Sequence, residues 1–389
     1  MSIKVKGLFE DIGGAGRVTE LRRKKLANAS SRPDPRDPIR ELADRLHPAE
    51  MKFRCVSVTD ASPSAKTFRF ESVDGHIPVF QCGQFVNFRL RIGESLLTRP
   101  YTISSAPYEA RGEKPFFEII VRRNVPYLVP DYLFENVKPG DVLDGALPFG
   151  TFYWEPLRDT KNIVALAGGS GITPFFSMAE AIADGIEDFE LTILYGSRTA
   201  EGILLREELD AVAARSGGRV KVVHVLSDEE REGYEHGFLT AELVRKYAPE
   251  GDYSVFMCGP QAMYDYEERE LQKLGLPRRR IRRELSGDCI MSEPAKVKYK
   301  LTLDIHGYRR TIDCLANESL EWAIERAGIK APTHCRSGEC GWCHARLVSG
   351  EVFVPERADG RRGADLKFGW LHPCASFPRS DVELEIFPG

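Results

Sequence analysis

The stretch Cys335-Arg-Ser-Gly-Glu-Cys340-Gly-Trp-Cys343 decides the fold of the C-terminal part of this chain, and Cys374 follows in Gly-Trp-Leu-His-Pro-Cys. The spacing C-x4-C-x2-C with a distant fourth cysteine is typical of a plant-type [2Fe–2S] cluster, whose two irons need four thiolates. Gly338 and Gly341 would let the loop curl so that backbone N–H groups face the sulfurs. We therefore predict that the four cysteines are iron ligands.

Two other interpretations of these cysteines are less favourable. Structural zinc sites usually pair a CxxC with a second CxxC or with HxxxH, and this spacing does neither. A disulfide framework suits short secreted chains, whereas this chain is long and has nine cysteines, an odd number.

Composition narrows the class of protein. The chain has 389 residues, with 42% hydrophobic and 29% charged residues, which predicts two or three globular domains. A net charge of −4 argues against nucleic acid as a partner. The N-terminus lacks the apolar stretch of a signal peptide and no run approaches the length of a membrane span, so we expect no membrane partner and a cytoplasmic location.

The pattern of residues changes along the chain. Residues 1–50 are polar and basic with a proline-broken middle, which predicts an extension with one short amphipathic helix at about Ile39–His47. This extension is either flexible or strapped onto the body, or it is a docking arm for a partner. From Met51 to about Tyr153, short alternating runs separated by turn residues predict an antiparallel barrel: Lys52–Thr59, Ala65–Phe70, Phe85–Ile92 and Phe116–Arg122.

Beyond residue 162, apolar strands alternate with helical segments, which predicts a parallel α/β sheet. Its expected strands are Ile163–Ala167, Leu191–Tyr195, Val220–Val225 and Tyr253–Cys258. Residues 286–297 are a predicted linker. The segment Val297–Phe387 predicts a hairpin, a helix at Ser319–Ala327 and the cysteine loop.

The string Arg99-Pro100-Tyr101-Thr102 follows a barrel strand and resembles the flavin-binding RxYS/T motif of the ferredoxin–NADP reductase family. Arg99 can pair with a flavin phosphate, Tyr101 can lie flat on the isoalloxazine, and the Thr102 hydroxyl can reach the N5 edge. Upstream, Cys82-Gly-Gln-Phe85 is similar to the PGQ turn of the family, with Cys82 in place of proline.

A glycine loop follows the first strand of the α/β region, Gly168-Gly169-Ser170-Gly171-Ile-Thr173-Pro174, and opens the next helix. Glycines allow close approach of a pyrophosphate, and a helix N-terminus attracts it. The loop resembles the nicotinamide-nucleotide loop of the same family. Cys258-Gly259-Pro260 is similar to the family's motif in which a cysteine lies against the nicotinamide, although a buried cysteine is more often plain core.

Three positions leave choices open. Arg198 ends the second strand where an acid would favour NADH, so its presence leans weakly toward NADPH, with either nucleotide allowed. Glu284 matches a family position that approaches the flavin, with a solvated charge as the alternative. Pro130 stands where the family's second flavin motif has a serine that binds the FAD pyrophosphate, and it can supply neither the hydroxyl nor the N–H. The resemblance still favours FAD, with FMN as the alternative.

The resemblance covers residues 51–389 and implies a multidomain protein. Its expected parts are an N-terminal extension (1–50), an antiparallel β-barrel flavin domain (51–157), an α/β parallel-sheet NAD(P)-binding domain (158–287) and an α+β (β-grasp) ferredoxin domain (297–389). The implied cofactors are FAD or FMN, NAD(P)H and a [2Fe–2S] cluster. The implied catalytic residues are Thr102, Cys258 and Glu284, and the implied cofactor-binding residues are Arg99, Pro100, Tyr101, Thr102, Gly168, Gly169, Ser170, Gly171, Thr173, Arg198, Cys258, Gly259 and Pro260.

The order of these modules predicts an NAD(P)H:acceptor oxidoreductase. A flavin between a hydride donor and a one-electron cluster must take two electrons and release them singly. The expected acceptor is a downstream redox protein, either the oxygenase component of a multi-component system or a reductive enzyme, and a non-enzymatic carrier is the least favoured alternative. Because the ferredoxin segment is nearly neutral, we expect the acceptor to bind exposed residues around the cluster loop: Trp342, Arg336 and the segment 355–368.

Overall fold

The computed structural model describes residues 8–29, 37–123, 128–284, 287–288, 291 and 297–386. It divides into two compact units, residues 1–45 and residues 46–389. The first unit contains helix α1 (Leu8–Ala27) and most of helix α2 (Pro38–Leu46). Among the described residues, no helix is long and apolar enough to cross a membrane.

Helix α1 was not predicted, because Gly13, Gly14 and Gly16 in its first half disfavour a helix. Its second half contains strong helix formers, and Glu20 pairs with Arg23 and Lys24 at the i,i+3 and i,i+4 spacings that stabilise a helix surface. Helix α2 confirms the predicted amphipathic helix.

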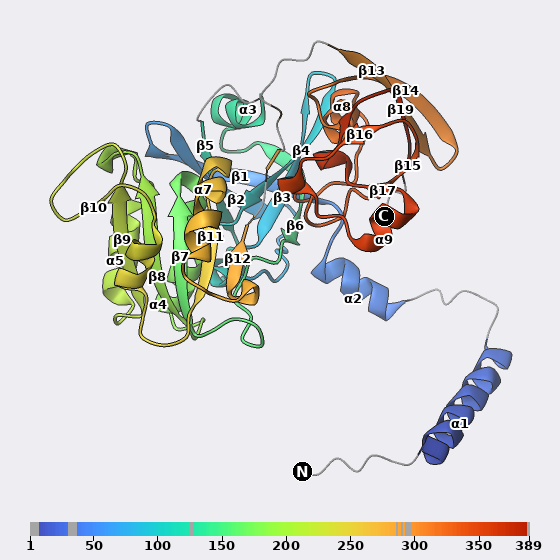
Figure 1. Ribbon diagram of the computed structural model, residues 1–389, viewed down its shortest axis with the longest axis horizontal. Coiled ribbons are helices and arrows are strands. Elements are labelled where there is room, and N and C mark those ends of the chain that lie inside the picture. The colour runs from blue at the N-terminus through green and yellow to red at the C-terminus, as the bar shows by residue number, and fades with distance from the viewer. Residues whose placement is uncertain are drawn as a thin grey trace. The chain divides into compact units, whose positions relative to one another are not determined.

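The first part of the large unit is a six-stranded antiparallel sheet that closes on itself (Figure 1). Its strands lie in the order β4-β3-β6-β1-β2-β5, and an isolated bridge from Ile103 to Ile119 joins the segment after β4 to β5. The core holds phenylalanine rings, with those of Phe53 and Phe117 in edge contact at 5.0 Å. The elements are β1 (Met51–Ser62), β2 (Ala65–Ser72), β3 (Phe85–Ile92), β4 (Ser95–Thr102), β5 (Phe117–Arg122), α3 (Leu128–Asn136) and β6 (Val142–Phe149).

The second part is a six-stranded parallel sheet, drawn in green to yellow in Figure 1, in the order β10-β9-β8-β7-β11-β12. Helices α4 and α5 pack on one face, and α6 and α7 pack on the other, so strand β7 is buried almost throughout. The elements are β7 (Asn162–Gly168), α4 (Thr173–Ala183), β8 (Glu190–Ser197), α5 (Arg206–Arg215), β9 (Val220–Leu226), β10 (Glu235–His236), α6 (Ala241–Tyr247), β11 (Ser254–Cys258), α7 (Gln261–Gln272) and β12 (Ile281–Arg283).

The third part, orange and red in Figure 1, is a mixed five-stranded sheet in the order β14-β13-β19-β15-β17 with helix α8 packed into its core. Strands β13 and β19 are parallel, and the other pairs are antiparallel. The elements are β13 (Lys298–Ile305), β14 (Tyr308–Leu315), α8 (Leu320–Arg326), β15 (Ala345–Ser349), β16 (Val352–Phe353), α9 (Gly363–Phe368), β17 (Trp370–Leu371), β18 (Phe377–Pro378) and β19 (Val382–Ile386). This order of barrel, parallel sheet and mixed sheet confirms the predicted fold class.

Candidate functional site

The structure brings the four predicted cluster cysteines together. The Sγ atoms of Cys343 and Cys374 lie 3.4 Å apart, and the thiol of Cys335 is in hydrogen-bond contact with those of Cys340 and Cys374. Hydrogen bonds from those two thiols hold the pKa of Cys335 well below its usual range, so one thiolate is already favoured without a metal. The four sulfurs thus form the all-thiolate ligand set that a [2Fe–2S] cluster requires.

The backbone of the cysteine loop is shaped by residues in left-handed conformations. Gly338 has a φ of +84°, and a Cβ there would lie 2.0 Å from the carbonyl oxygen of Ala358. This position therefore excludes any side chain. The N–H of Cys340 donates to Cys335 Sγ at 3.4 Å and that of Trp342 to Cys340 Sγ at 3.5 Å. Such amide donors stabilise the negative charge of thiolate ligands.

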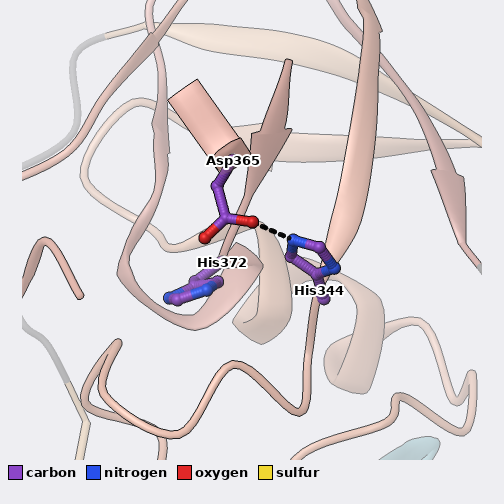
Figure 2. Close-up of side chains that lie close together, drawn as sticks. All are labelled: His344, Asp365 and His372. Carbon is purple, nitrogen blue, oxygen red and sulfur yellow. Dashed lines mark hydrogen bonds and ion pairs between the residues drawn. The ribbon is translucent and has the colours of Figure 1, made fainter. Parts of the chain in front are cut away.

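Figure 2 shows a second polar group, formed by the side chains of His344, Asp365 and His372. His344 follows Cys343, His372 lies two residues before Cys374, and their ring nitrogens and an oxygen of Asp365 lie within 4.8 Å of one another. His344 Nε2 is 2.8 Å from Asp365 Oδ1, and the buried ring of His372 uses Nδ1 to bond the carbonyl oxygen of Gly338 at 2.6 Å. Because both rings already have polar partners, we interpret the group as support that holds the cysteine loop.

The flavin-motif residues lie on strand β4, where Thr102 pairs with Phe85 of β3 at the strand end and Pro100 pairs with Asn87. Tyr101 packs against the barrel core. Arg99 is buried and its Nη2 has no hydrogen-bond partner among the described residues. A buried guanidinium N–H without a partner next to an aromatic ring fits a motif that receives the phosphate of a flavin.

Arg99 has partners that sequence reasoning did not identify. Its Nη1 lies 2.9 Å from Glu325 of helix α8, its Nε lies 3.2 Å from Asp288, and its guanidinium lies 4.7 Å from the centre of the Trp322 ring. Glu325 and Trp322 belong to the mixed-sheet domain, so the barrel and that domain meet at the flavin motif. Pro130 falls in the first turn of α3 and adds no N–H donor there.

The glycine loop connects β7 to α4 as predicted. Residues Gly169–Ile172 form a 3₁₀ turn, and the Thr173 hydroxyl donates to the carbonyl oxygen of Ser170 at 3.1 Å. A Cβ on Gly171 would lie 2.1 Å from the carbonyl oxygen of Cys258, so only glycine allows the loop to approach the end of β11 this closely.

A cavity of about 780 Å³ opens at the carboxyl ends of the parallel strands. This size and this position are typical of a nucleotide site. Of the predicted nucleotide residues, Gly168, Gly169, Arg198 and Pro260 line it. Arg122 and Asp228 line it too, and neither was singled out from the sequence. Arg122 comes from barrel strand β5, and its Nη1 would lie 2.9 Å from a Cβ on Gly169.

Asp228 lies at the same end of the cavity as Arg198. Its carboxylate accepts from Arg198 Nε at 2.7 Å and from the Ser227 hydroxyl at 2.6 Å. These two hydrogen bonds lower the pKa of Asp228, which is therefore ionised at neutral pH.

Cys258 and Glu284 form a buried pair at the carboxyl ends of two strands. Cys258 is the last residue of β11, and Glu284 directly follows β12. The two side chains hydrogen-bond to each other, the N–H of Gly259 donates to Tyr264 Oη at 3.1 Å, and the Tyr264 hydroxyl donates to the carbonyl oxygen of Glu284. Burial raises the pKa of Glu284 to about 8, and burial together with the Glu284 carboxyl raises the pKa of Cys258 well above its usual value. The thiol therefore stays protonated and is no nucleophile.

The prediction of an exposed contact residue was wrong at one position. Arg336 was expected on an exposed loop, but its side chain is only 1% exposed because it is enclosed by the acids Asp288, Glu321 and Glu325. Trp342, by contrast, is 53% exposed, and the helix α9 within 355–368 exposes Leu366 and Phe368.

Three family models match the chain in the order of these domains. They are the oxidoreductase FAD-binding domain at residues 52–154, the oxidoreductase NAD-binding domain at residues 165–268 and the 2Fe-2S iron-sulfur cluster binding domain at residues 303–379. The chain belongs to the ferredoxin–NADP reductase family with a C-terminal [2Fe–2S] domain. The cofactors of this family member are FAD, NAD(P)H and a [2Fe–2S] cluster.

Individual proteins agree with this assignment. The reductase subunit of glycine betaine monooxygenase from Pseudomonas aeruginosa is 27% identical over 354 residues, which cover 85% of this chain and 94% of that protein. The ferredoxin reductase component of 3-ketosteroid-9-alpha-monooxygenase from Rhodococcus rhodochrous is 27% identical over 78% of this chain and 86% of that protein. Phthalate dioxygenase reductase shares the fold, with a TM-score of 0.64 and 24% identity over 87% of this chain and 98% of that one.

Proposed function

We propose that the protein is the reductase component of an oxygenase system and passes electrons singly from NADH to a partner protein. The observation that carries the proposal is the direct contact between the flavin motif and the cluster domain, in which the N–H of Thr98, next to Arg99, donates to Glu325 of α8 at 2.7 Å. When bound, FAD accepts the two electrons of a hydride and yields them one at a time to the [2Fe–2S] cluster.

The residues of the chain would orient these groups. Arg99 would hold the flavin phosphate through its unpartnered Nη2, and Tyr101 and Thr102 would lie against the isoalloxazine. The glycine loop and Arg122 would bind the nucleotide pyrophosphate. The protonated thiol of Cys258 and the protonated carboxyl of Glu284 supply a neutral, buried surface against the nicotinamide, where an ionised group would attract the positive charge of the oxidised ring and slow release of the product.

NADH is favoured over NADPH by the pair Arg198 and Asp228. Asp228 already neutralises Arg198 and would repel a 2′-phosphate, whereas a ribose 2′-hydroxyl can donate to its carboxylate. Asp228 therefore reverses the weak preference for NADPH that Arg198 alone suggests.

An oxygenase component is favoured as the acceptor because the two curated relatives described above are named as reductase parts of monooxygenases. An electron feeder for a reductive enzyme is the alternative. Trp342, whose N–H donates to the cluster cysteine Cys340, is exposed, as are Leu366 and Phe368 of helix α9, and apolar side chains of this kind bind protein partners. We place the protein in the cytoplasm, since none of the eight cysteines among the described residues forms a disulfide.

Purified protein with full cofactor content tests the proposal. It should contain one flavin, two irons and two acid-labile sulfides per chain, and NADH should reduce the flavin and then the cluster in anaerobic stopped flow. Zinc in place of iron, or a cluster that stays oxidised while the flavin is reduced, would refute the electron path. Coupled turnover with the oxygenase component, compared with turnover with a reductive enzyme, identifies the acceptor.

A further inference from the structure

Two arginines and two acids form a closed ring of largely buried ion pairs between the flavin motif and the cysteine loop, with the Asp288 side chain 18% exposed. Asp288 accepts from Arg99 Nε at 3.2 Å with Oδ2 and from Arg336 Nε with Oδ1. Glu325 lies 2.9 Å from Arg99 Nη1 with Oε2 and 2.9 Å from Arg336 Nη1 with Oε1. Each carboxylate therefore bridges both guanidinium groups.

The charges in this ring balance. It holds two guanidinium groups and two carboxylates, and a third acid, Glu321, lies 3.9 Å from Arg336. Burial raises the pKa of Glu321 to about 8, so this acid is mostly neutral at pH 7. Removal of any one member of the ring would leave one charge without compensation in a largely buried site, which is strongly unfavourable.

The ring reaches both redox sites. Arg336 directly follows the cluster ligand Cys335 and has a φ of +63°, a conformation that a non-glycine residue holds only when its surroundings impose it. At the other end, Arg99 belongs to the flavin motif and keeps Nη2 free for a phosphate. The N–H of Gly287, next to Asp288, also donates to the carbonyl oxygen of Cys335 at 3.1 Å. The ring thus spans the gap between flavin motif and cluster ligand through contiguous contacts.

We propose that this ring fixes the cysteine loop against the flavin domain, with Glu325 and Arg336 as positioning residues for electron transfer from flavin to cluster. The inference rests on the proposed function. Misplacement of reacting groups by about 1 Å can lower a rate by about 100-fold, so loss of the ring should slow this one step. Neither Glu325 nor Arg336 lines the nucleotide cavity, so we expect hydride transfer to be kept in variants of either residue when they are compared at matched flavin content.

The test uses Glu325→Gln in the full chain loaded with FAD and cluster. The amide keeps the size of the side chain and can still accept from the Thr98 N–H, but it loses the charge. A matched control is Arg326→Gln, in the last turn of the same helix, which breaks the more exposed pair of Arg326 with Glu318. We expect flavin-to-cluster transfer in stopped flow to fall at least about 10-fold in Glu325→Gln, with flavin reduction by NADH within about two-fold of wild type. Arg326→Gln should change neither step.

Arg336→Lys supplies a second variant. It keeps the charge but cannot bond both acids with one planar group, so an intermediate rate is expected. The reduced cluster should keep its electron paramagnetic resonance spectrum in both variants, because the ligands are unchanged. A changed spectrum would mean that the ring acts on the cluster itself and would overturn the positioning role.

A second measurement needs no cofactor activity. The melting temperature of the flavin-stripped protein should fall by at least about 3 °C in Glu325→Gln and not in Arg326→Gln. Equal transfer rates and equal melting in Glu325→Gln and wild type would overturn the inference while leaving the proposed function intact. A wild-type protein that cannot reduce its cluster, but whose melting responds to Glu325→Gln, would instead refute the function and keep the ring as a structural lock.

Discussion

The carboxyl group of Glu284 hydrogen-bonds to the thiol of Cys258, and both are buried. The residues come from adjacent parallel strands, since the N–H of Glu284 donates to the carbonyl oxygen of Met257 at 3.0 Å. This arrangement shields two titratable groups from water and keeps both neutral near pH 7.

The raised pKa of Glu284 predicts a pH-dependent stability. The folded-state pKa is about 8 against an ordinary value near 4.5, so its contribution to stability is fully present below pH 4.5 and is lost as the pH rises through 8. Glu284→Gln cannot ionise and should therefore gain stability relative to wild type as the pH rises from 5 to 8.5. Urea unfolding at both pH values measures the difference, and a constant difference would contradict the assigned pKa.

Replacement of Cys258 should slow hydride transfer. We expect Cys258→Ala to reduce the rate of anaerobic flavin reduction at saturating NADH by about 10-fold, a barrier change of about 1.4 kcal/mol, at constant flavin content. An unchanged rate would assign Cys258 to core packing alone.

Loss of a cluster ligand should stop electron transfer out of the protein and leave electron transfer from NADH to the flavin. Cys340→Ser should leave flavin reduction by NADH nearly intact and abolish reduction of cytochrome c. Stopped flow at the flavin band and steady-state cytochrome c assays measure the two halves separately. Failure of the flavin step in a variant that still binds flavin would contradict separate incoming and outgoing sites.

Asp228 should determine nucleotide choice. Asp228→Ser removes the carboxylate that faces Arg198, so kcat/KM for NADPH should rise at least about 10-fold while that for NADH falls. Glu230→Ser, on the same loop, is the control because Glu230 does not line the cavity. An unchanged ratio of the two nucleotides would rule out Asp228 as the discriminating group.

His372 should stabilise the cluster without ligating it. In His372→Ala the loop loses the bond to the carbonyl oxygen of Gly338, and we expect loss of the cluster in air to be about 10-fold faster or more, as for other residues that orient metal ligands. The decay of cluster absorbance measures this, with His306→Ala, on the exposed β13–β14 turn, as the control. Equal decay in both variants and wild type would remove the supporting role.

Much of the fold could be predicted because each domain has a local pattern. The alternation of apolar and polar residues predicted strand β2 with its end two residues too early. The glycine loop predicted where helix α4 begins. Residues 285–286 and most of the 286–297 linker lie outside the described residues, so the predicted role of this segment is not tested. The boundaries of the domains as predicted are likewise untested.

The ion-pair ring could not be predicted. Arg99 and Glu325 are 226 positions apart in the chain, and the flavin motif around Arg99 gives no sign of an acidic partner, so only tertiary structure pairs them. Arg336 was misjudged for the same reason, because an arginine next to a metal ligand is exposed unless acids from other elements enclose it. The sequence contained one signal for Asp228, because it is the first acidic residue after strand β9. The prediction of nucleotide choice used the end of strand β8, where Arg198 lies, and so missed it.

The approach of Arg122 to Gly169 restricts how this protein can exchange parts with its relatives. Because the arginine belongs to the barrel and the glycine to the parallel-sheet domain, a nucleotide domain with any other residue at position 169 would place a Cβ 2.9 Å from the guanidinium. A barrel that carries the arginine therefore suits a nucleotide domain that has the glycine, and a chimeric enzyme with a larger residue at position 169 would have to move the guanidinium out of this contact.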